Sequence, residues 1–91
     1  MRIRQAGRVT GRVQGVGFRA FVEHTAREMG FTGWVKNMPD GSVTMEVQGE
    51  EADFPALSAR IEAGNAYSQV TGAAWEGRPC VREEETFAIR R

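Results

Sequence analysis

Hydrophobic residues recur every three or four positions in two segments of the chain, as they do in helices that bury one face. The first such face consists of Phe18, Phe21, Val22, Thr25, Ala26 and Met29, and the second of Phe54, Leu57 and Ile61. Gly30 can end the first helix in a left-handed conformation, and Gly64 lies beyond the second, which we place at residues 51–63. Pro55 is tolerated in this second helix because its missing N–H falls near the first turn. The spacing therefore predicts two helices.

Five other segments read as extended. Residues 2–10 precede the first helix, and residues 33–37 and 42–48 are separated by the turn sequence MPDG, which predicts a hairpin. Residues 69–76 and 86–89 read as two further strands, joined by the polar segment EGRPCVREEE. The chain thus begins with a strand, and strands follow each helix.

The order strand, helix, strand, strand, helix, strand is that of a split βαβ unit. In such a unit an antiparallel sheet carries both helices on one face. We therefore predict the α+β class, with a ferredoxin-like βαββαβ sandwich. Because 91 residues supply one hydrophobic core, and no linker or repeat interrupts them, we expect residues 1–91 to form a single domain.

The charges of the chain balance, with 12 Lys and Arg side chains against 12 Asp and Glu. No overall field draws such a protein to nucleic acid or to an anionic membrane, so an anion must be captured locally. Cys80 is the single cysteine, which excludes an internal disulfide and, with a single histidine, disfavours a structural zinc site. The chain carries no apolar run of membrane-spanning length, and its polar start MRIRQAGR lacks the apolar region that a signal peptide would have. We expect a cytoplasmic monomer.

The segment VTGRVQGVGFR, residues 9–19, places a glycine-rich loop between the first strand and the first helix. Gly15 and Gly17 permit backbone angles that other residues avoid, so several N–H groups can converge on one point at the helix N-terminus. Arg19, in the first helical turn, can donate two hydrogen bonds to a phosphate. A loop that merely turns the chain has the same composition. Neither a nucleotide P-loop nor GxGxxG is present, which argues against nucleotide binding.

This segment and a second one resemble the two signatures of the acylphosphatase family. The first matches at Gly11, Val13, Gln14, Gly15, Val16, Phe18 and Arg19. The second, GWVKNMPDGSVTMEVQG, matches at the aromatic residue after Gly33, at Lys36 and Asn37, and at Gly41, Val43 and Gly49. Chain length and element order agree as well, so the resemblance covers essentially the whole chain.

The resemblance implies a role for each site residue. The phosphate of an acyl phosphate is held by the backbone N–H groups of Gln14, Gly15, Val16, Gly17, Phe18 and Arg19. The side chain of Arg19 holds it as well, and Asn37 orients the attacking water, which makes these two the catalytic residues. The products are a carboxylate and inorganic phosphate, and the resemblance implies neither a metal nor a cofactor.

The residues that the chain offers suit this reaction. The leaving carboxylate has a parent acid of pKa about 4, so it departs without a proton and requires no general acid. What remains is to place a water in line and to stabilise charge on the phosphoryl oxygens. The neutral amide of Asn37 can accept a hydrogen bond from water, whereas an Asp would repel the substrate. No side chain clearly takes the proton of the water, and our hypothesis is that the substrate phosphate does.

Two other functions share parts of this pattern. A non-catalytic module that binds phosphate or carboxylate, such as a detached version of the acylphosphatase-like domain of larger maturation proteins, has the same loop. RNA-recognition domains share the order of elements. Residues 43–47 offer no exposed aromatic side chain for base stacking, however, and we expect no nucleic-acid partner.

Several other residues are expected to have no catalytic role. His24 lies on the polar side of the first helix, Cys80 lies in a polar loop, and residues 83–85 form an acidic run that should face solvent. Trp34 and Trp75 are expected to be packing residues.

Two places depart from the family. Gly7 stands where the first strand should carry an aliphatic side chain, and residues 6–10 alternate poorly. The stretch GNAYSQVTGAAWEG, which follows the second helix, lacks the prolines often found there in relatives. Neither departure removes a residue with an assigned role.

Overall fold

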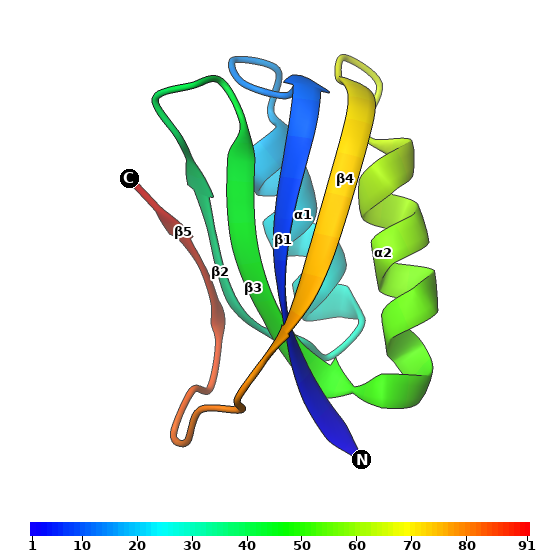
Figure 1. Cartoon of the computed structure of the whole chain (residues 1–91), viewed down its shortest axis with the longest axis vertical. Coiled ribbons are helices and arrows are strands. Elements are labelled where there is room, and N and C mark those ends of the chain that lie inside the picture. Colours follow the sequence, from blue (N-terminus) through cyan, green and yellow to red (C-terminus); the bar gives the residue numbers. More distant parts are fainter.

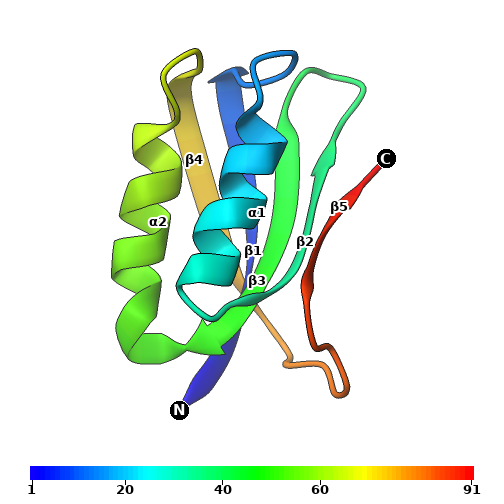
Figure 2. The same cartoon turned by 180° about the vertical axis from the view of Figure 1, so that it is seen from behind.

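The computed structural model describes residues 1–91. In chain order its elements are β1 (Arg2–Arg12), α1 (Phe18–Glu28), β2 (Thr32–Asn37), β3 (Val43–Glu50), the 3₁₀ turn η1 (Glu51–Asp53), α2 (Phe54–Ala63), β4 (Gln69–Arg78) and β5 (Phe87–Arg90). Both helices lie on one face of a twisted sheet, whose other face they leave open (Figures 1 and 2). The predicted ferredoxin-like α+β sandwich is therefore confirmed. Neither helix has the length and hydropathy that a membrane span requires.

The sheet has five strands in the order β4-β1-β3-β2-β5. The pairs β1–β3, β1–β4 and β2–β3 are antiparallel, as predicted. The last strand differs, because β5 pairs with β2 in parallel, with Gly33 opposite Phe87 and Lys36 opposite Arg90. This parallel pair makes the sheet mixed. The connection between β4 and β5 crosses from one edge of the sheet to the other (Figure 1).

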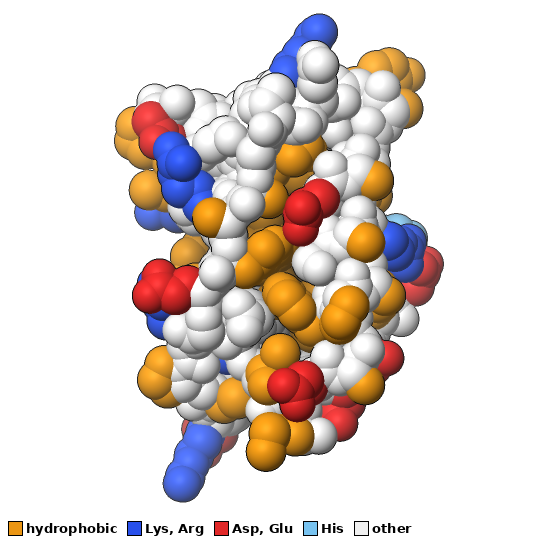
Figure 3. Space-filling view, turned by 45° about the vertical axis from the view of Figure 1, so that its right-hand side comes forward, with side chains coloured by type: hydrophobic (Ala, Val, Ile, Leu, Met, Phe, Trp, Pro, Cys, Tyr) orange, Lys and Arg blue, Asp and Glu red, His pale blue; other side chains and the backbone are white.

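The core lies between the sheet and the helices. Its buried hydrophobic members are Val9, Val13, Phe18, Val22, Ala26, Phe31, Val35, Val43, Met45, Val47, Leu57, Ile61 and Phe87. On the side where β4 and α2 lie, hydrophobic side chains line a hollow that reaches the surface (Figure 3). Phe54 of α2 and Trp75 of β4 pack edge to face, with ring centroids 5.2 Å apart.

Two element boundaries differ from those predicted. The second helix is α-helical only from Phe54, because residues 51–53 form the 3₁₀ turn η1. The first strand continues to Arg12, with an irregularity in its pairing to β4 between Thr10 and Gly11. Apolar and polar side chains alternate poorly in this strand because Gly7 has no room for a side chain. Gly7 lies opposite Trp75, and a Cβ there would stand 2.4 Å from the indole ring.

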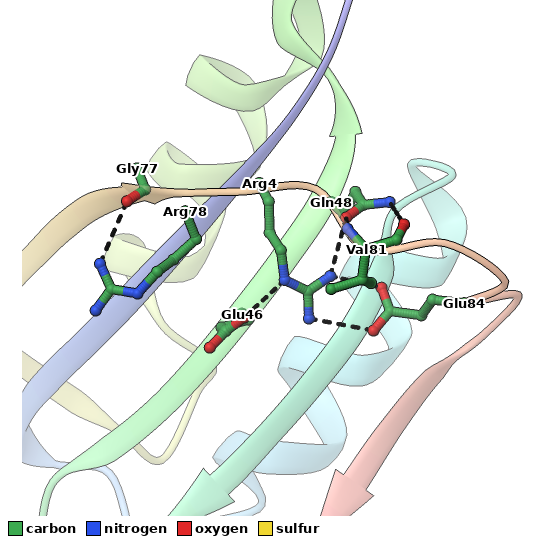
Figure 4. A network of polar contacts seen from close by, with 7 residues as sticks. All are labelled: Arg4, Glu46, Gln48, Gly77, Arg78, Val81 and Glu84. Carbon is green, nitrogen blue, oxygen red and sulfur yellow. Dashed lines mark hydrogen bonds and ion pairs between the residues drawn. The ribbon is translucent and has the colours of Figure 1, made fainter.

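A polar network on the open face corrects the interpretation of the acidic run. Arg4 of β1, whose side chain is 3% exposed, donates to Glu46 at 2.6 Å and pairs with Glu84 at 2.8 Å (Figure 4). Glu84 is therefore an anchor for the segment between β4 and β5, and only its neighbours Glu83 and Glu85 are exposed. Gln48 adds a second anchor, because its amide exchanges two hydrogen bonds with the backbone of Val81. His24 and Cys80 are exposed, as predicted.

Candidate active site

Three connections lie together at one end of the sheet: the β1–α1 loop, the β2–β3 turn and the α2–β4 loop (Figure 1). A cleft of about 210 Å³ opens at this end. It is lined by Val13, Gly15, Gly17, Phe18, Arg19, Ala20, Asn37 and Ile89. The two predicted catalytic residues, which come from different elements, thus share one cleft.

The glycine-rich loop presents its N–H groups without protein partners. Gly15 and Gly17 have φ angles of 72° and 76°, which lie in the left-handed region that glycine adopts most readily. No N–H group from Gly15 to Ala20 donates a hydrogen bond to another group of the protein. Because α1 begins at Phe18, this run combines the loop amides with the free amides of the first helical turn. Such a run is suited to an anion.

Arg19 extends from the first turn of α1 toward the end of β5. Its Nη1 donates to the backbone carbonyl oxygen of Arg90 at 3.0 Å. The Arg90 side chain turns to the other face of the sheet, where its guanidinium lies 4.9 Å from the ring centroid of Trp34. The last strand therefore restrains the Arg19 guanidinium through a single hydrogen bond, while the remaining N–H groups stay available.

Asn37 is the last residue of β2. Its Oδ1 is buried and accepts no hydrogen bond from the protein. A buried amide oxygen without a partner is costly, and native structures usually supply one in the form of a ligand or a water. Asn37 thus lines the cleft and carries an amide oxygen whose acceptor capacity the protein does not use.

Gln14 and Val16 do not line the cleft. The Gln14 side chain turns to the β2–β3 turn, where its Nε2 donates to the carbonyl oxygens of Met38 and Ser42 at 2.8 and 2.9 Å. The carbonyl oxygen of Val16 accepts a hydrogen bond from Asn65. Both residues thus tie the loop to its neighbours, and their role in holding substrate stays a prediction.

The β2–β3 turn is itself held by an Asx-type contact. Asp40 accepts hydrogen bonds from the backbone N–H and the hydroxyl of Ser42, at 2.9 and 2.6 Å, and pairs with Arg8 at 2.8 Å. The hydrogen bond from the Ser42 hydroxyl, followed by that from Arg8, holds the pKa of Asp40 well below its usual range. The turn that follows Asn37 is therefore fixed by a charged side chain.

The cleft includes three residues that the sequence did not single out for the site: Val13, Ala20 and Ile89. Val13 belongs to the first motif and Ala20 follows it directly, so their proximity was foreseeable. Ile89 reaches the cleft because β5 pairs in parallel with β2, opposite Val35, and it remains 38% exposed. The spacing of Phe87 and Ile89 indicated that both side chains lie on the same side of the strand. It did not indicate that this strand would pair with β2.

A second hollow, of about 700 Å³, lies mainly over the open face of the sheet. The side chains around it include Ala6, Arg8, Trp34, Glu46 and Arg78. Trp34 lies here beneath Arg90, half-buried, rather than in the core. Neither Arg19 nor Asn37 lines this hollow, and both line the smaller cleft.

Comparison with known proteins agrees with the motifs. The family profile described as Acylphosphatase matches residues 5–89. The acylphosphatase of Geobacillus kaustophilus is 48% identical over 81 residues, which cover 89% of this chain and 86% of that protein. The crystal structure of acylphosphatase from Bacillus subtilis superposes with a TM-score of 0.93 at 32% identity, covering 98% of this chain and 99% of that one.

A larger protein contains a similar unit. Full-length HypF, in its phosphate- and nucleotide-bound form, matches with a TM-score of 0.90 at 29% identity over 100% of this chain but only 12% of its own. The profile match and the relatives of similar length together decide the assignment. The chain belongs to the acylphosphatase family of enzymes.

Proposed function

We propose that this enzyme hydrolyses the carboxyl-phosphate bond of acyl phosphates, with Arg19 and the amides of residues 14–19 holding the phosphate and Asn37 orienting the water. One observation carries the proposal. Arg19 and Asn37 line the same cleft, at whose rim the run of N–H groups from Gly15 onward has no protein acceptor. Cationic and amide donors together match the charge of a phosphoryl group.

The reaction demands little covalent chemistry from the protein. The bond to the carboxylate breaks as water attacks phosphorus in line, and the electron pair leaves with a carboxylate that is stable without a proton. Negative charge spreads over the phosphoryl oxygens in the transition state. Preorganised N–H groups and the Arg19 guanidinium stabilise this charge without reorganising.

Asn37 is proposed to place the nucleophile. Its unpartnered Oδ1 can accept a hydrogen bond from the attacking water, which aligns the oxygen lone pair with phosphorus. The proton of the water passes to a phosphoryl oxygen of the substrate, so that no side chain of the cleft has to act as a base. Because positioning and charge stabilisation supply the catalysis, turnover requires no metal.

The test is hydrolysis of acetyl phosphate and benzoyl phosphate in excess EDTA by the wild type, Arg19→Ala and Asn37→Ala. Removing a transition-state arginine should lower the rate by about 10³-fold or more. Asn37→Ala should lower kcat while competitive inhibition by inorganic phosphate changes little. Arg60→Ala, which removes an exposed arginine of α2 paired with Glu28, is the matched control and should keep wild-type activity.

Near wild-type rates in both site variants would refute the residue assignments. Phosphate binding by the wild type without any hydrolysis would instead favour a non-catalytic phosphate-binding module, for which the match to HypF offers a structural parallel. Turnover that EDTA abolishes would contradict the metal-independent mechanism.

A further inference from the structure

Asn65, in the α2–β4 loop, reaches across to the glycine-rich loop from the side opposite the β2–β3 turn. Its Nδ2 donates to the carbonyl oxygen of Val16 at 2.8 Å. The same nitrogen lies 3.6 Å from where a Cβ of Gly17 would stand. The loop that carries the free amides is thus contacted by a residue outside both sequence motifs.

The Val16 carbonyl and the Gly17 N–H belong to one peptide unit. A trans peptide is planar, so its C=O and N–H bonds point in opposite directions. A hydrogen bond that holds the carbonyl toward Asn65 therefore turns the N–H of Gly17 away from Asn65. Gly17 lines the cleft, and its N–H has no acceptor in the protein.

Resting on the proposed function, we propose that Asn65 is a positioning residue of the active site, which fixes the Val16–Gly17 peptide with its N–H toward the bound phosphate. The unit turns over by rotation about ψ of Val16 and φ of Gly17, and Gly17 tolerates many backbone angles, so this side of the peptide resists the turn only weakly. The hydrogen bond from Asn65 to the Val16 carbonyl selects one orientation of this peptide. The contact also polarises the peptide, which strengthens its N–H as a donor.

The orientation of the Asn65 amide follows from chemistry. A carbonyl oxygen only accepts hydrogen bonds, so the NH₂ end of the side chain must face Val16. The other end, Oδ1, is buried and has no partner, so the contact with Val16 is the one side-chain hydrogen bond that Asn65 makes.

The backbone around Asn65 is held in place. Its N–H donates to the Ser68 hydroxyl at 2.9 Å, and its carbonyl accepts from the N–H of Ser68 at 3.2 Å. Gly64, at φ 74°, ends α2 immediately before it. The side chain is therefore presented to the loop by a closed turn at a helix end, which is the kind of rigid support that a positioning residue needs.

Two variants test the inference. Asn65→Ala removes the donor, and Asn65→Asp keeps the shape but places an acceptor against the Val16 carbonyl. We expect the inhibition constant of inorganic phosphate, and with it KM, to rise by about 3- to 10-fold in Asn65→Ala, in line with loss of one hydrogen bond. Asn65→Asp should lose more, because its carboxylate also repels the anion. Thr10→Val, which deletes a side-chain hydrogen bond to the carbonyl of Gly72, is the control and should bind phosphate normally.

A spectroscopic readout separates positioning from stability. In ¹H–¹⁵N spectra of the wild type, titration with inorganic phosphate should shift the amide signals of Gly15 and Gly17. In the Asn65 variants the shift of Gly17 should shrink while that of Gly15 persists. Asn65→Asp, being isosteric, serves for this comparison if the alanine variant does not fold.

The outcomes are distinguishable. If phosphate moves no loop amide in the wild type, the anion site itself is wrong and the proposed function fails with it. If the wild type responds and the Asn65 variants keep both the Gly17 shift and the wild-type inhibition constant, the proposed function stands and the role of Asn65 is refuted.

Discussion

Arg4 and Glu84, which are 80 residues apart in sequence, form a two-point ion pair with N–O distances of 2.8 and 3.2 Å. Arg4 lies near the beginning of β1, between β4 and β3, and Glu84 lies in the segment that carries the chain from β4 to β5 (Figure 4). The pair therefore attaches the last part of the chain to the sheet before β5 begins. The buried Arg4 guanidinium also donates to Glu46 and Gln48, so it makes four hydrogen bonds to side chains.

Glu84→Gln should lower the free energy of unfolding by about 3 kcal/mol. This value is at the lower end of the roughly 3–5 kcal/mol that breaking a buried ion pair costs, because Arg4 keeps Glu46 as a partner. The Arg4 side chain is only 3% exposed, so water cannot replace the lost carboxylate fully. Urea unfolding followed by circular dichroism measures the change. Glu85→Gln, one residue along and exposed, is the matched control and should stay within about 0.5 kcal/mol. Equal losses of unfolding free energy in the two variants would contradict the role of Glu84 as an anchor of the segment between β4 and β5.

The fold should lose stability in acid. Burial raises the pKa of Glu84, but the hydrogen bonds and the charge of Arg4 outweigh it and lower the pKa below its ordinary value. The pKa of Asp40 is lowered too, by Ser42 and Arg8. Carboxyls with a lower pKa in the folded state stabilise it above their unfolded pKa, and this contribution disappears as the pH falls through the folded value.

The unfolding free energy should therefore be nearly constant around neutral pH and decline once the pH falls below about 4. Urea titrations at several pH values between about pH 7 and about pH 3 measure the profile. The double variant Glu84→Gln/Asp40→Asn should be less stable at neutral pH and lose less on acidification. A profile parallel to that of the wild type would show that these two carboxyls are not responsible.

Gly7→Ala should destabilise the protein by about 1–3 kcal/mol, because the new Cβ overlaps the indole of Trp75. The steric term outweighs the gain of about 0.4–1 kcal/mol that replacing glycine brings through the unfolded chain. Gly77→Ala, whose Cβ would meet nothing nearer than 3.9 Å, is the control and should be neutral or slightly stabilising.

A double-mutant cycle tests whether Gly7 and Trp75 interact. Adding Trp75→Leu to Gly7→Ala should cost less than the sum of the two single changes, because the smaller side chain makes room for the methyl group. Strict additivity would mean that Gly7 and Trp75 do not interact.

Gln14→Met should reduce both stability and kcat. The two carbonyl oxygens of Met38 and Ser42 lose their donor, at a cost of about 1–3 kcal/mol, and the turn next to Asn37 is released. Thermal unfolding and steady-state kinetics on acetyl phosphate measure the two effects. Gln69→Met, at an exposed position of β4, is the control. Unchanged kcat in Gln14→Met would show that the turn does not position Asn37.

Much of the fold follows from local patterns. The spacing of Phe18, Val22 and Ala26 defined α1, and the alternation of Val43, Met45 and Val47 defined β3, because a helix or strand that buries one face must repeat its apolar residues at its own period. The glycine loop and Arg19 are also local in sequence, but a plain turn shares their composition, so their predicted role in holding phosphate came from the resemblance to the acylphosphatase signatures.

The remaining features depend on partners that are distant in sequence. Residues 83–85 were predicted to face solvent because the partner of Glu84, Arg4, is distant in sequence. Gly7 looked anomalous because the side chain that excludes a Cβ there, Trp75, lies on another strand. Ile89 reaches the cleft because β5 pairs in parallel with β2. The connection from β4 carries the chain to this edge of the sheet. Side-chain periodicity shows which residues share a face but not which strand lies alongside.

The hydrogen bond from Arg19 to the Arg90 carbonyl links the cleft to the shortest strand of the sheet, which pairs on one side only. An edge strand of four residues is the element most prone to fray. Whenever β5 detaches, the guanidinium loses its tether and the cleft loses one wall. Under the proposed function, the free energy of this local opening and the affinity of the cleft for phosphate are coupled, so an occupied cleft and a docked β5 would favour one another.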